Sequence, residues 1–182
     1  MFENAKWITR KPWLEWRMPS YEELPPAPYL TKSFDVEKDV TSAVLNIVAY
    51  GQGAYFINGK RIPDSYLPTV HSLTDKTLVY CSYDLTGDIV NGKNKIGVVI
   101  GNDFQTNQAN PYRGNVRMIA QLDITYKDGT AQQIVSNTSW KTADSPILFD
   151  MRRCGEKFDA RLKINGWCDP DFDDSHWDNA FI

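Results

Sequence analysis

The sequence predicts an all-β domain, an antiparallel β-sandwich of jelly-roll type that follows an extended N-terminal arm. Short segments rich in β-branched and aromatic residues recur along the chain, and turn-forming Gly, Pro and Asn residues separate them. No segment shows the apolar period of a helix longer than a turn or two. The length of 182 residues matches about one domain, which is enough to bury a core.

The arm comprises residues 1–28 and contains Trp7, Trp13 and Trp16. Five prolines within it exclude a long helix, because proline lacks the backbone donor that a helix interior needs. Three indole rings are unfavourable in water, so we expect the arm to pack across the sandwich or onto a neighbouring domain. The sandwich itself is expected to span residues 29–182.

Seven segments of this region have the composition of strands, bounded by turn formers. They are residues 29–35, 42–50, 54–58, 78–85, 95–101, 116–127 and 131–135. Asn58-Gly59 and Asp128-Gly129 are dipeptides that accept the positive φ angles of type I′ hairpins, so each is expected to join two antiparallel neighbours. Asn91-Gly92 marks a third reversal in a longer loop.

Two of these segments also predict which faces are buried. From Met118 to Tyr126 apolar and polar residues alternate, with only Ile119 off the pattern, which indicates a strand with one face on the core. Residues 44–49 form a nearly continuous apolar run, as expected of a central strand covered on both faces.

Composition excludes several classes of function. Apolar residues make up 42% and charged residues 24% of the chain, as in ordinary globular domains. A net charge of -3 without a basic cluster argues against nucleic-acid binding, and no apolar run is long enough to span a membrane. The N-terminus lacks a secretory signal, so we predict a cytoplasmic protein if Met1 is the native start, and otherwise a periplasmic or secreted one after signal removal.

The three cysteines, Cys81, Cys154 and Cys168, fit no metal-binding spacing. We expect reduced thiols with a structural role. A disulfide between Cys154 and Cys168 is the alternative in an oxidising compartment.

Residues 155–177 are the most informative part of the chain, since they mix charges and aromatic rings without any period. Gly155 to Arg161 reads Gly-Glu-Lys-Phe-Asp-Ala-Arg, Gly166-Trp167 follows, and Asp173 to Trp177 reads Asp-Asp-Ser-His-Trp. Neither an amphipathic element nor a disordered tail has this composition. The segment is therefore expected to be ordered, irregular chain held by specific pairings.

These motifs resemble the end of the N-terminal β-sandwich module, of galactose-binding-like type, in bacterial α-L-rhamnosidases. Further similar motifs precede them in the chain, in the order that the family shows, at residues 5–8, 29–34, 55–60, 80–86 and 94–101. Each is weak alone, and their order carries the resemblance. The chain departs from the family at Gly101–Gln105, where many relatives have Gly-x-Gly-Trp-Tyr.

The resemblance implies that this chain is one part of a larger multidomain glycoside hydrolase. In such enzymes an (α/α)₆ barrel of the same polypeptide carries the carboxylates that hydrolyse terminal α-L-rhamnosides. This chain lacks the length and the helical period of a barrel, so we expect no catalytic residue in it. Two roles stay open: a unit that binds rhamnose-containing carbohydrate, or a scaffold that positions the barrel.

The loop between the strands predicted at 95–101 and 116–127 is the candidate sugar site. Its amides, carboxylate, arginine and aromatic rings are suited to hydroxyl groups and to a pyranose face. The candidate carbohydrate-binding residues are Asn102, Asp103, Phe104, Gln105, Asn107, Tyr112 and Arg113. No cofactor is assigned, but some members of this sandwich group bind L-rhamnose with calcium, and Asp103 and Asn107 are the candidate ligands. A domain contact or simple solvation of this loop are the alternatives.

Glu156 and Asp159 could be read as the acid pair of a glycoside hydrolase. A structural interpretation is favoured, in which they accept hydrogen bonds from Arg161, Arg152 or backbone N–H groups. Residues 169–174 begin like a calcium loop but lack the glycine and the final glutamate that such a loop needs.

We expect instead that Asp173 or Asp174 caps a short helical turn that delivers Trp177 into an apolar notch. The residues to which we assign structural roles are Glu156, Asp159, Arg161, Trp167, Asp173, Asp174 and Trp177.

Overall fold

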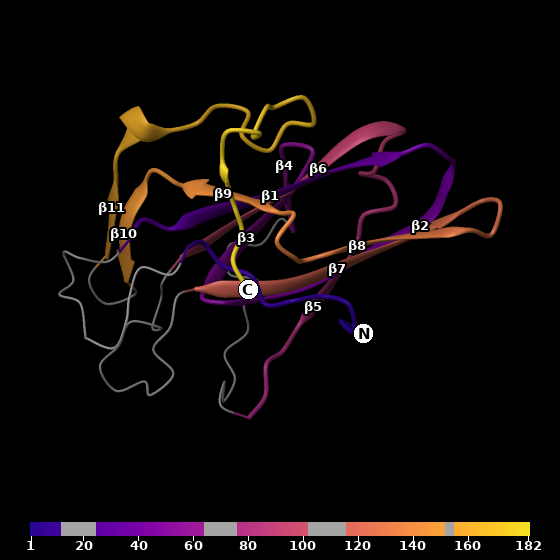
Figure 1. Cartoon of the computed structure of the whole chain (residues 1–182), viewed down its shortest axis with the longest axis horizontal. Helices are drawn as coiled ribbons and strands as arrows, with labels where there is room; N and C mark the ends of the chain where they lie inside the picture. The colour runs from indigo at the N-terminus through magenta and orange to yellow at the C-terminus, as the bar shows by residue number, and fades with distance from the viewer. Residues whose placement is uncertain (12–24, 64–75, 102–115, 152–154) are drawn as a thin grey trace.

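The computed structural model of the chain describes residues 1–11, 25–63, 76–101, 116–151 and 155–182, and shows an all-β architecture (Figure 1). The strands are β1 (Pro28–Val36), β2 (Val40–Tyr50), β3 (Gln52–Ile57), β4 (Lys60–Ile62), β5 (Cys81–Asp84), β6 (Gly92–Gly101), β7 (Arg117–Tyr126), β8 (Ala131–Val135), β9 (Lys141–Asp144), β10 (Ile147–Met151), β11 (Gly155–Phe158) and β12 (Asp178–Asn179). Helical structure in the described part of the chain is limited to one 3₁₀ turn, η2 (Ala160–Leu162). No helix in these described ranges is long and apolar enough to cross a membrane.

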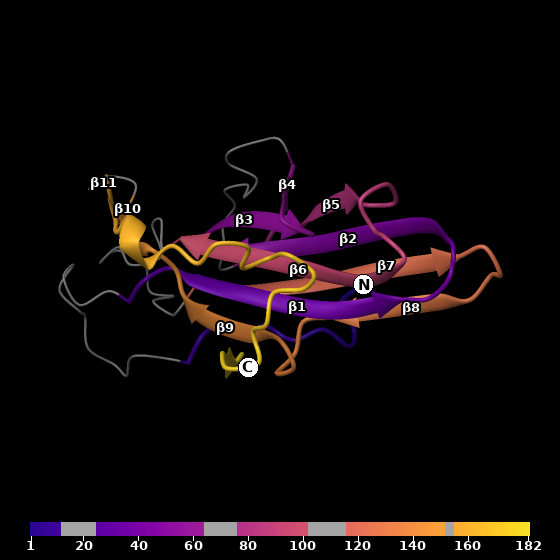
Figure 2. The ribbon, with the colours of Figure 1, turned by 90° about the horizontal axis from the view of Figure 1, so that it is seen from above.

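Two antiparallel sheets form the body of the domain. One has six strands in the order β12-β9-β1-β6-β3-β4, and the other has four in the order β5-β2-β7-β8. They lie one above the other in Figure 1. The hairpin of β10 and β11, with η2, lies at one end of the molecule, far from the turn between β7 and β8 (Figure 2).

The main core lies between these two sheets. Met118, Leu122 and Ile124 of β7 are fully buried in it and share one cluster with Leu30 of β1 and Val98 of β6. This confirms the predicted alternation along β7, because every second side chain of a strand points to the same face.

Ile119, the residue off that pattern, belongs to a second and smaller core. With Val48 of β2 and Ala5 it forms an apolar cluster on the other face of the four-stranded sheet, against which Phe2 and Trp7 pack. The N-terminal segment therefore covers the outside of this sheet. Strand β2 is apolar on both faces, as its sequence predicts, because both faces are covered.

The two ends of the chain join the sheets along one side. Ile8 and Met118 exchange two backbone hydrogen bonds of 2.8 and 2.9 Å, and Thr9 and Phe181 exchange two of 2.9 Å. Two residues before the latter bridge, Asn179 of β12 pairs with Lys141 of β9. The N-terminal segment thus bridges β7 of one sheet to the C-terminal strand of the other.

All seven predicted strand segments contain strands, although β5 is shorter than predicted. The sequence reading missed β4, β9, β10, β11 and β12. These have two to five residues each, too few to show a period in the sequence.

Both predicted hairpins are present, but only the first has the predicted turn. Asn58 and Gly59 have φ angles of 50° and 79°, as a type I′ turn requires. In the second hairpin Gly129 has a φ of 82° while Asp128 does not have a positive φ. Asp128 instead accepts a hydrogen bond from Thr130 N at 2.9 Å, and its side chain favours a longer loop that places only the glycine in the left-handed region.

Candidate functional site

The predicted sugar-binding residues lie outside the described part of the chain. This holds for Asn102, Asp103, Phe104, Gln105, Asn107, Tyr112 and Arg113, and therefore for both candidate calcium ligands. The structure does describe the residues between which this loop runs, namely Gly101 at the end of β6 and Val116 just before β7.

The two sheets are joined at this end of the sandwich. Gly51 alone separates β2 from β3, with a φ of 131° that favours glycine. Tyr50 lies opposite Arg117 in one sheet, and Gln52 lies opposite Gly101 in the other. A Cβ atom on Gly51 would collide with the carbonyl oxygen of Gly101, so close approach of the two sheets requires glycine here.

Charged and aromatic groups surround these anchor positions. The Arg117 guanidinium lies 4.4 Å from the ring centroid of Tyr50 and 5.9 Å from that of Trp7. On the side of the six-stranded sheet the Asp150 carboxylate lies against Gly101, where it would collide with an added Cβ. The loop of the predicted sugar site therefore begins and ends beside a cation, a carboxylate and aromatic rings, the groups that proteins use to hold hydroxylated ligands.

Asp159 and Arg161 form a tight local pair at the end of β11. One Asp159 oxygen accepts from Arg161 Nε at 2.9 Å and from its backbone N–H at 3.0 Å, and the other lies 2.6 Å from Nη2. This bonding lowers the pKa of Asp159 from its ordinary value. A general acid of a glycosidase needs a raised pKa, so the pair fits a structural role and not proton donation.

Glu156 lies on β11 opposite Asp150 of β10, with an exposed side chain. Arg152, the other predicted partner of these acids, is not among the described residues. Within the described ranges no group of three or more His, Cys, Asp or Glu residues is placed to hold a metal ion.

Residues 166–177 cover the outer face of the six-stranded sheet. The ring centroid of Tyr29 on β1 lies 4.2 Å from that of Trp167 and 5.9 Å from that of Trp177. Gly97 of β6 makes room for this layer, since a Cβ there would lie 2.5 Å from Cys168 Sγ and 2.6 Å from the Trp167 ring. The segment is thus ordered by aromatic stacking on a strand far away in the sequence.

Cys168 is a free, buried thiol within this layer. Cys154, its partner in the predicted alternative of a disulfide, lies outside the described residues. Burial raises the pKa of Cys168 to about 11, because a thiolate is costly away from water.

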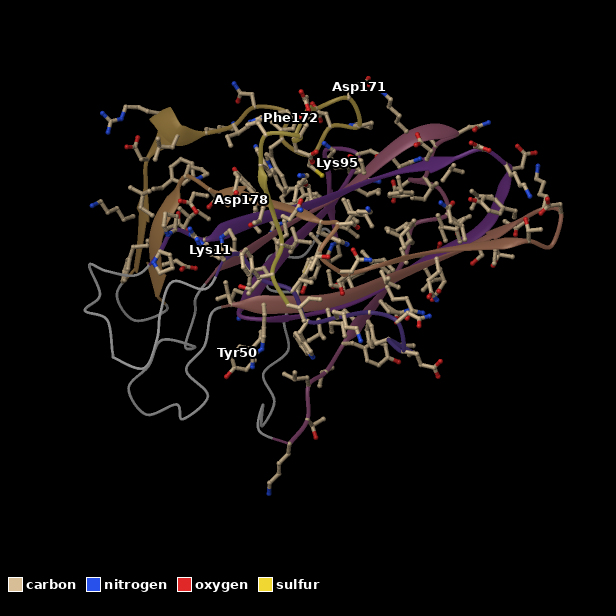
Figure 3. The ribbon with its side chains drawn as sticks, viewed as in Figure 1. Lys11, Tyr50, Lys95, Asp171, Phe172 and Asp178 are labelled. Atoms are coloured by element: carbon tan, nitrogen blue, oxygen red, sulfur yellow. The ribbon has the colours of Figure 1, made fainter. Side chains whose placement is uncertain are left out.

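Lys95 of β6 binds residues 166–177 to the outer face of the six-stranded sheet (Figure 3). Its side chain is fully buried, and Nζ donates to Phe172 O at 2.6 Å and lies 3.1 Å from Asp174 Oδ2. The hydroxyl of Thr31 donates to the same Asp174 oxygen at 2.7 Å. Lys95 was not identified from the sequence, because it follows two polar residues, Lys93 and Asn94, at the polar end of its strand.

The prediction for Asp173 and Asp174 is wrong in one respect. Asp173 Oδ1 accepts a hydrogen bond from Ser175 N at 2.9 Å, and Asp174 O accepts one from Trp177 N at 3.0 Å. The backbone at residues 174–177 forms a simple turn, whereas a helical turn was predicted. The difference arises because Asp174 uses its side chain for Lys95 and Thr31, which holds the backbone on the sheet. Trp177 is 7% exposed, packed into its own domain.

Comparisons with known proteins agree with this arrangement of strands and covering segment. The family model described as "Alpha-L-rhamnosidase N-terminal domain" matches residues 38–182. An α-L-rhamnosidase of Alteromonas sp. (strain LOR) is 34% identical over 185 residues, covering 96% of this chain and 20% of that protein.

Solved structures are similar over the same region. The α-L-rhamnosidase from Dictyoglumus thermophilum is 36% identical with a TM-score of 0.88, over 98% of this chain and 21% of that one. The Streptomyces avermitilis α-L-rhamnosidase complexed with L-rhamnose is 30% identical with a TM-score of 0.77, over 86% and 16% respectively. The chain spans about a fifth of the length of the relatives it matches. By sequence and by structure, this chain belongs to the α-L-rhamnosidase N-terminal domain family.

Proposed function

We propose that this domain is a non-catalytic, carbohydrate-binding module of an α-L-rhamnosidase, and that the full-length enzyme hydrolyses terminal α-L-rhamnosides. The observation that carries the proposal is the similarity, at a TM-score of 0.77, to an enzyme solved in complex with L-rhamnose. We further assign the sandwich to the jelly-roll, galactose-binding-like type. Its proposed division is the arm of residues 1–28 and the sandwich of residues 29–182.

The proposed sugar contacts come from residues 102–113, with Asp103 and Asn107 as ligands of a calcium ion. Support comes from the anchors of this loop, Gly101 and Val116, at the sheet end where Arg117 and Asp150 lie. Carboxylate and amide oxygens are the ligands that calcium prefers, and they also accept sugar hydroxyls.

Isothermal titration of the chain with L-rhamnose, with calcium and then with a chelator, tests this function. We expect saturable heat that weakens on chelation, and we expect its calcium-dependent part to disappear in Asp103→Ala. Asp171→Ala is the matched control, because Asp171 is an 87% exposed carboxylate whose recorded partner is the surface residue Lys93. Absence of saturable heat in the wild-type chain would contradict carbohydrate binding, and calcium-dependent heat that Asp103→Ala retains in full would contradict the loop assignment.

Catalysis by this chain alone is not part of the proposal. The low pKa of Asp159, caused by its bonds to Arg161, makes this residue a poor proton donor. We expect the chain to release nothing from a chromogenic α-L-rhamnoside.

A scaffold that packs on the catalytic barrel is the second candidate function. The supporting observation is a pair of exposed apolar side chains, Phe158 at the end of β11 and Leu162 in η2, which are 51% and 50% exposed. They lie at the end of the molecule formed by β10, β11 and η2 (Figure 2). By contrast, Trp177 is used within its own domain.

The double variant Phe158→Ser with Leu162→Ser separates the two roles. If this surface is a scaffold contact, the substitutions should lower the thermal midpoint of a full-length enzyme while leaving that of the 182-residue chain unchanged. Equal midpoints of the full-length protein with and without the substitutions would rule out this contact.

A further inference from the structure

A pocket of about 380 Å³ lies where three distant parts of the chain meet. Its wall includes Arg10 and Lys11 from the N-terminal segment, Asp144 from β9, and His176, Trp177 and Asp178 from the C-terminal segment. Figure 3 labels Lys11 and Asp178, which face this region from two of the three segments. None of these residues belongs to the loop of the proposed sugar site.

Backbone pairing holds the walls of the pocket in place. Asp178 lies opposite Thr142 in the ladder of β12 and β9, and the Thr9–Phe181 bridge fixes the N-terminal segment beside it. Arg10 Nη1 lies 2.6 Å from Asp144 Oδ1 and donates to Pro26 O at 3.2 Å. The pocket is therefore preorganised, which lowers the entropy that a ligand must lose on binding.

The charges of the wall discriminate between classes of ligand. With His176 counted as neutral, two cations, Arg10 and Lys11, balance two carboxylates, Asp144 and Asp178. An anionic ligand would be repelled by the two carboxylates, and a cationic ligand would be repelled by the two basic groups. A neutral polyol is the class that matches this wall, because each hydroxyl both donates and accepts a hydrogen bond.

The size of the pocket narrows the class of ligand further. A volume of 380 Å³ is near the lower end of the range of roughly 300 to 1,000 Å³ that is typical of small-molecule pockets, so it suits one sugar ring.

We propose that this pocket binds one neutral sugar residue, as a second carbohydrate site separate from residues 102–113. Asp178 accepts bonds from the sugar hydroxyls, Lys11 and His176 donate to them, and the edge of Trp177 forms the apolar part of the wall. The choice of a sugar among neutral polyols rests on the proposed function. The pocket itself and the balance of charges in its wall are independent of that function.

The test is a titration of the ¹⁵N-labelled chain followed by amide chemical shifts. The probes are L-rhamnose, D-glucuronate and inorganic phosphate. We expect L-rhamnose to shift the amides of residues 10–11, 142–144 and 176–178 in a saturable way. The two anions should leave the chemical shifts of these amides unchanged. Larger shifts with either anion than with L-rhamnose would overturn the assignment to a neutral ligand.

Two isosteric variants make the test specific. Asp178→Asn should weaken L-rhamnose binding at these amides by about tenfold or more, the equivalent of about 1.4 kcal/mol, because an amide accepts fewer hydroxyls than a carboxylate. Asp171→Asn, on the surface beside Lys93, should leave the binding unchanged. The unperturbed amides and the thermal midpoint of each variant show whether it has kept the fold.

The outcomes separate this site from the proposed function. L-rhamnose binding that Asp103→Ala abolishes, with no shift at the pocket, would overturn the second site and leave the proposed function intact. Pocket shifts that persist in Asp103→Ala and weaken in Asp178→Asn support the second site. Binding of none of the probes would contradict both.

Discussion

Lys95 Nζ lies 3.1 Å from Asp174 Oδ2, and the lysine is fully buried while the aspartate is 15% exposed. The ion pair joins the middle of β6 to the segment that covers the outer face of the sheet. Phe172 contributes both its carbonyl oxygen, 2.6 Å from Nζ, and its ring, whose centroid lies 5.2 Å away. A charge in an apolar layer is tolerable only with such partners, so the covering segment and the lysine depend on each other.

Asp174→Asn should destabilise the domain by roughly 3 to 5 kcal/mol, since it leaves the buried Lys95 without a counter-charge. Urea unfolding followed by tryptophan fluorescence measures this loss. The matched control is Lys93→Met on the same strand, whose pair with Asp171 is exposed and should contribute at most about 1 kcal/mol. Equal unfolding midpoints for the two variants would refute the role of the buried pair.

Gly97→Ala should destabilise the domain by about 1 to 3 kcal/mol. The new methyl group would lie 2.5 Å from Cys168 Sγ and 2.6 Å from the Trp167 ring, so the covering segment must move outwards. Gly87→Ala is the control, because no atom lies within 4 Å of a Cβ built there. Thermal unfolding monitored by circular dichroism distinguishes them, and an unchanged midpoint for Gly97→Ala would show that the layer does not pack as described.

Stability should fall at alkaline pH through Cys168. Burial raises its pKa from 9.0 to about 11, so the folded state holds this proton more tightly than the unfolded state. The stabilisation is complete below pH 9 and is lost as the pH rises towards 11, by up to about 3 kcal/mol. Urea midpoints at several pH values should therefore decline more steeply for the wild-type chain than for Cys168→Ala, and parallel declines would refute this linkage.

Asp159→Asn should reduce stability slightly at neutral pH and not at all at low pH. Arg161 lowers the pKa of Asp159 from 3.8, so the carboxylate stabilises the folded state above that pH and ceases to do so as the pH falls through the lowered value. The difference between wild-type and variant melting temperatures, measured from pH 7 downwards, should shrink to zero. A difference that grows on acidification would have the wrong sign for this pair.

Sequence patterns predicted the local architecture well where they were long enough. The alternation from Met118 to Tyr126 predicted which face of β7 is buried, and its exception, Ile119, marked the second core beneath the N-terminal segment. Asn58-Gly59 predicted a turn whose φ angles the structure reproduces. Strands such as β4 and β12 were missed because two or three residues carry no period.

The candidate site was less predictable. The motif from Gly155 to Trp177 indicated ordered chain and an acid–arginine pairing, and Asp159 with Arg161 has such a geometry. The sequence did not indicate that Lys95 would be the partner of Asp174, nor that Tyr29 would contact both Trp167 and Trp177.

By itself, the sequence determined seven of the twelve described strands, the Asn58-Gly59 turn and the family, because these depend on the order of side chains along one stretch of backbone. Only the tertiary structure decided which segments lie side by side: Lys95 under Asp174, and Arg10 with Asp144 and Asp178 around one pocket. The physical reason is that strand register and sheet packing set the positions of these groups, and both result from contacts between residues far apart in the chain.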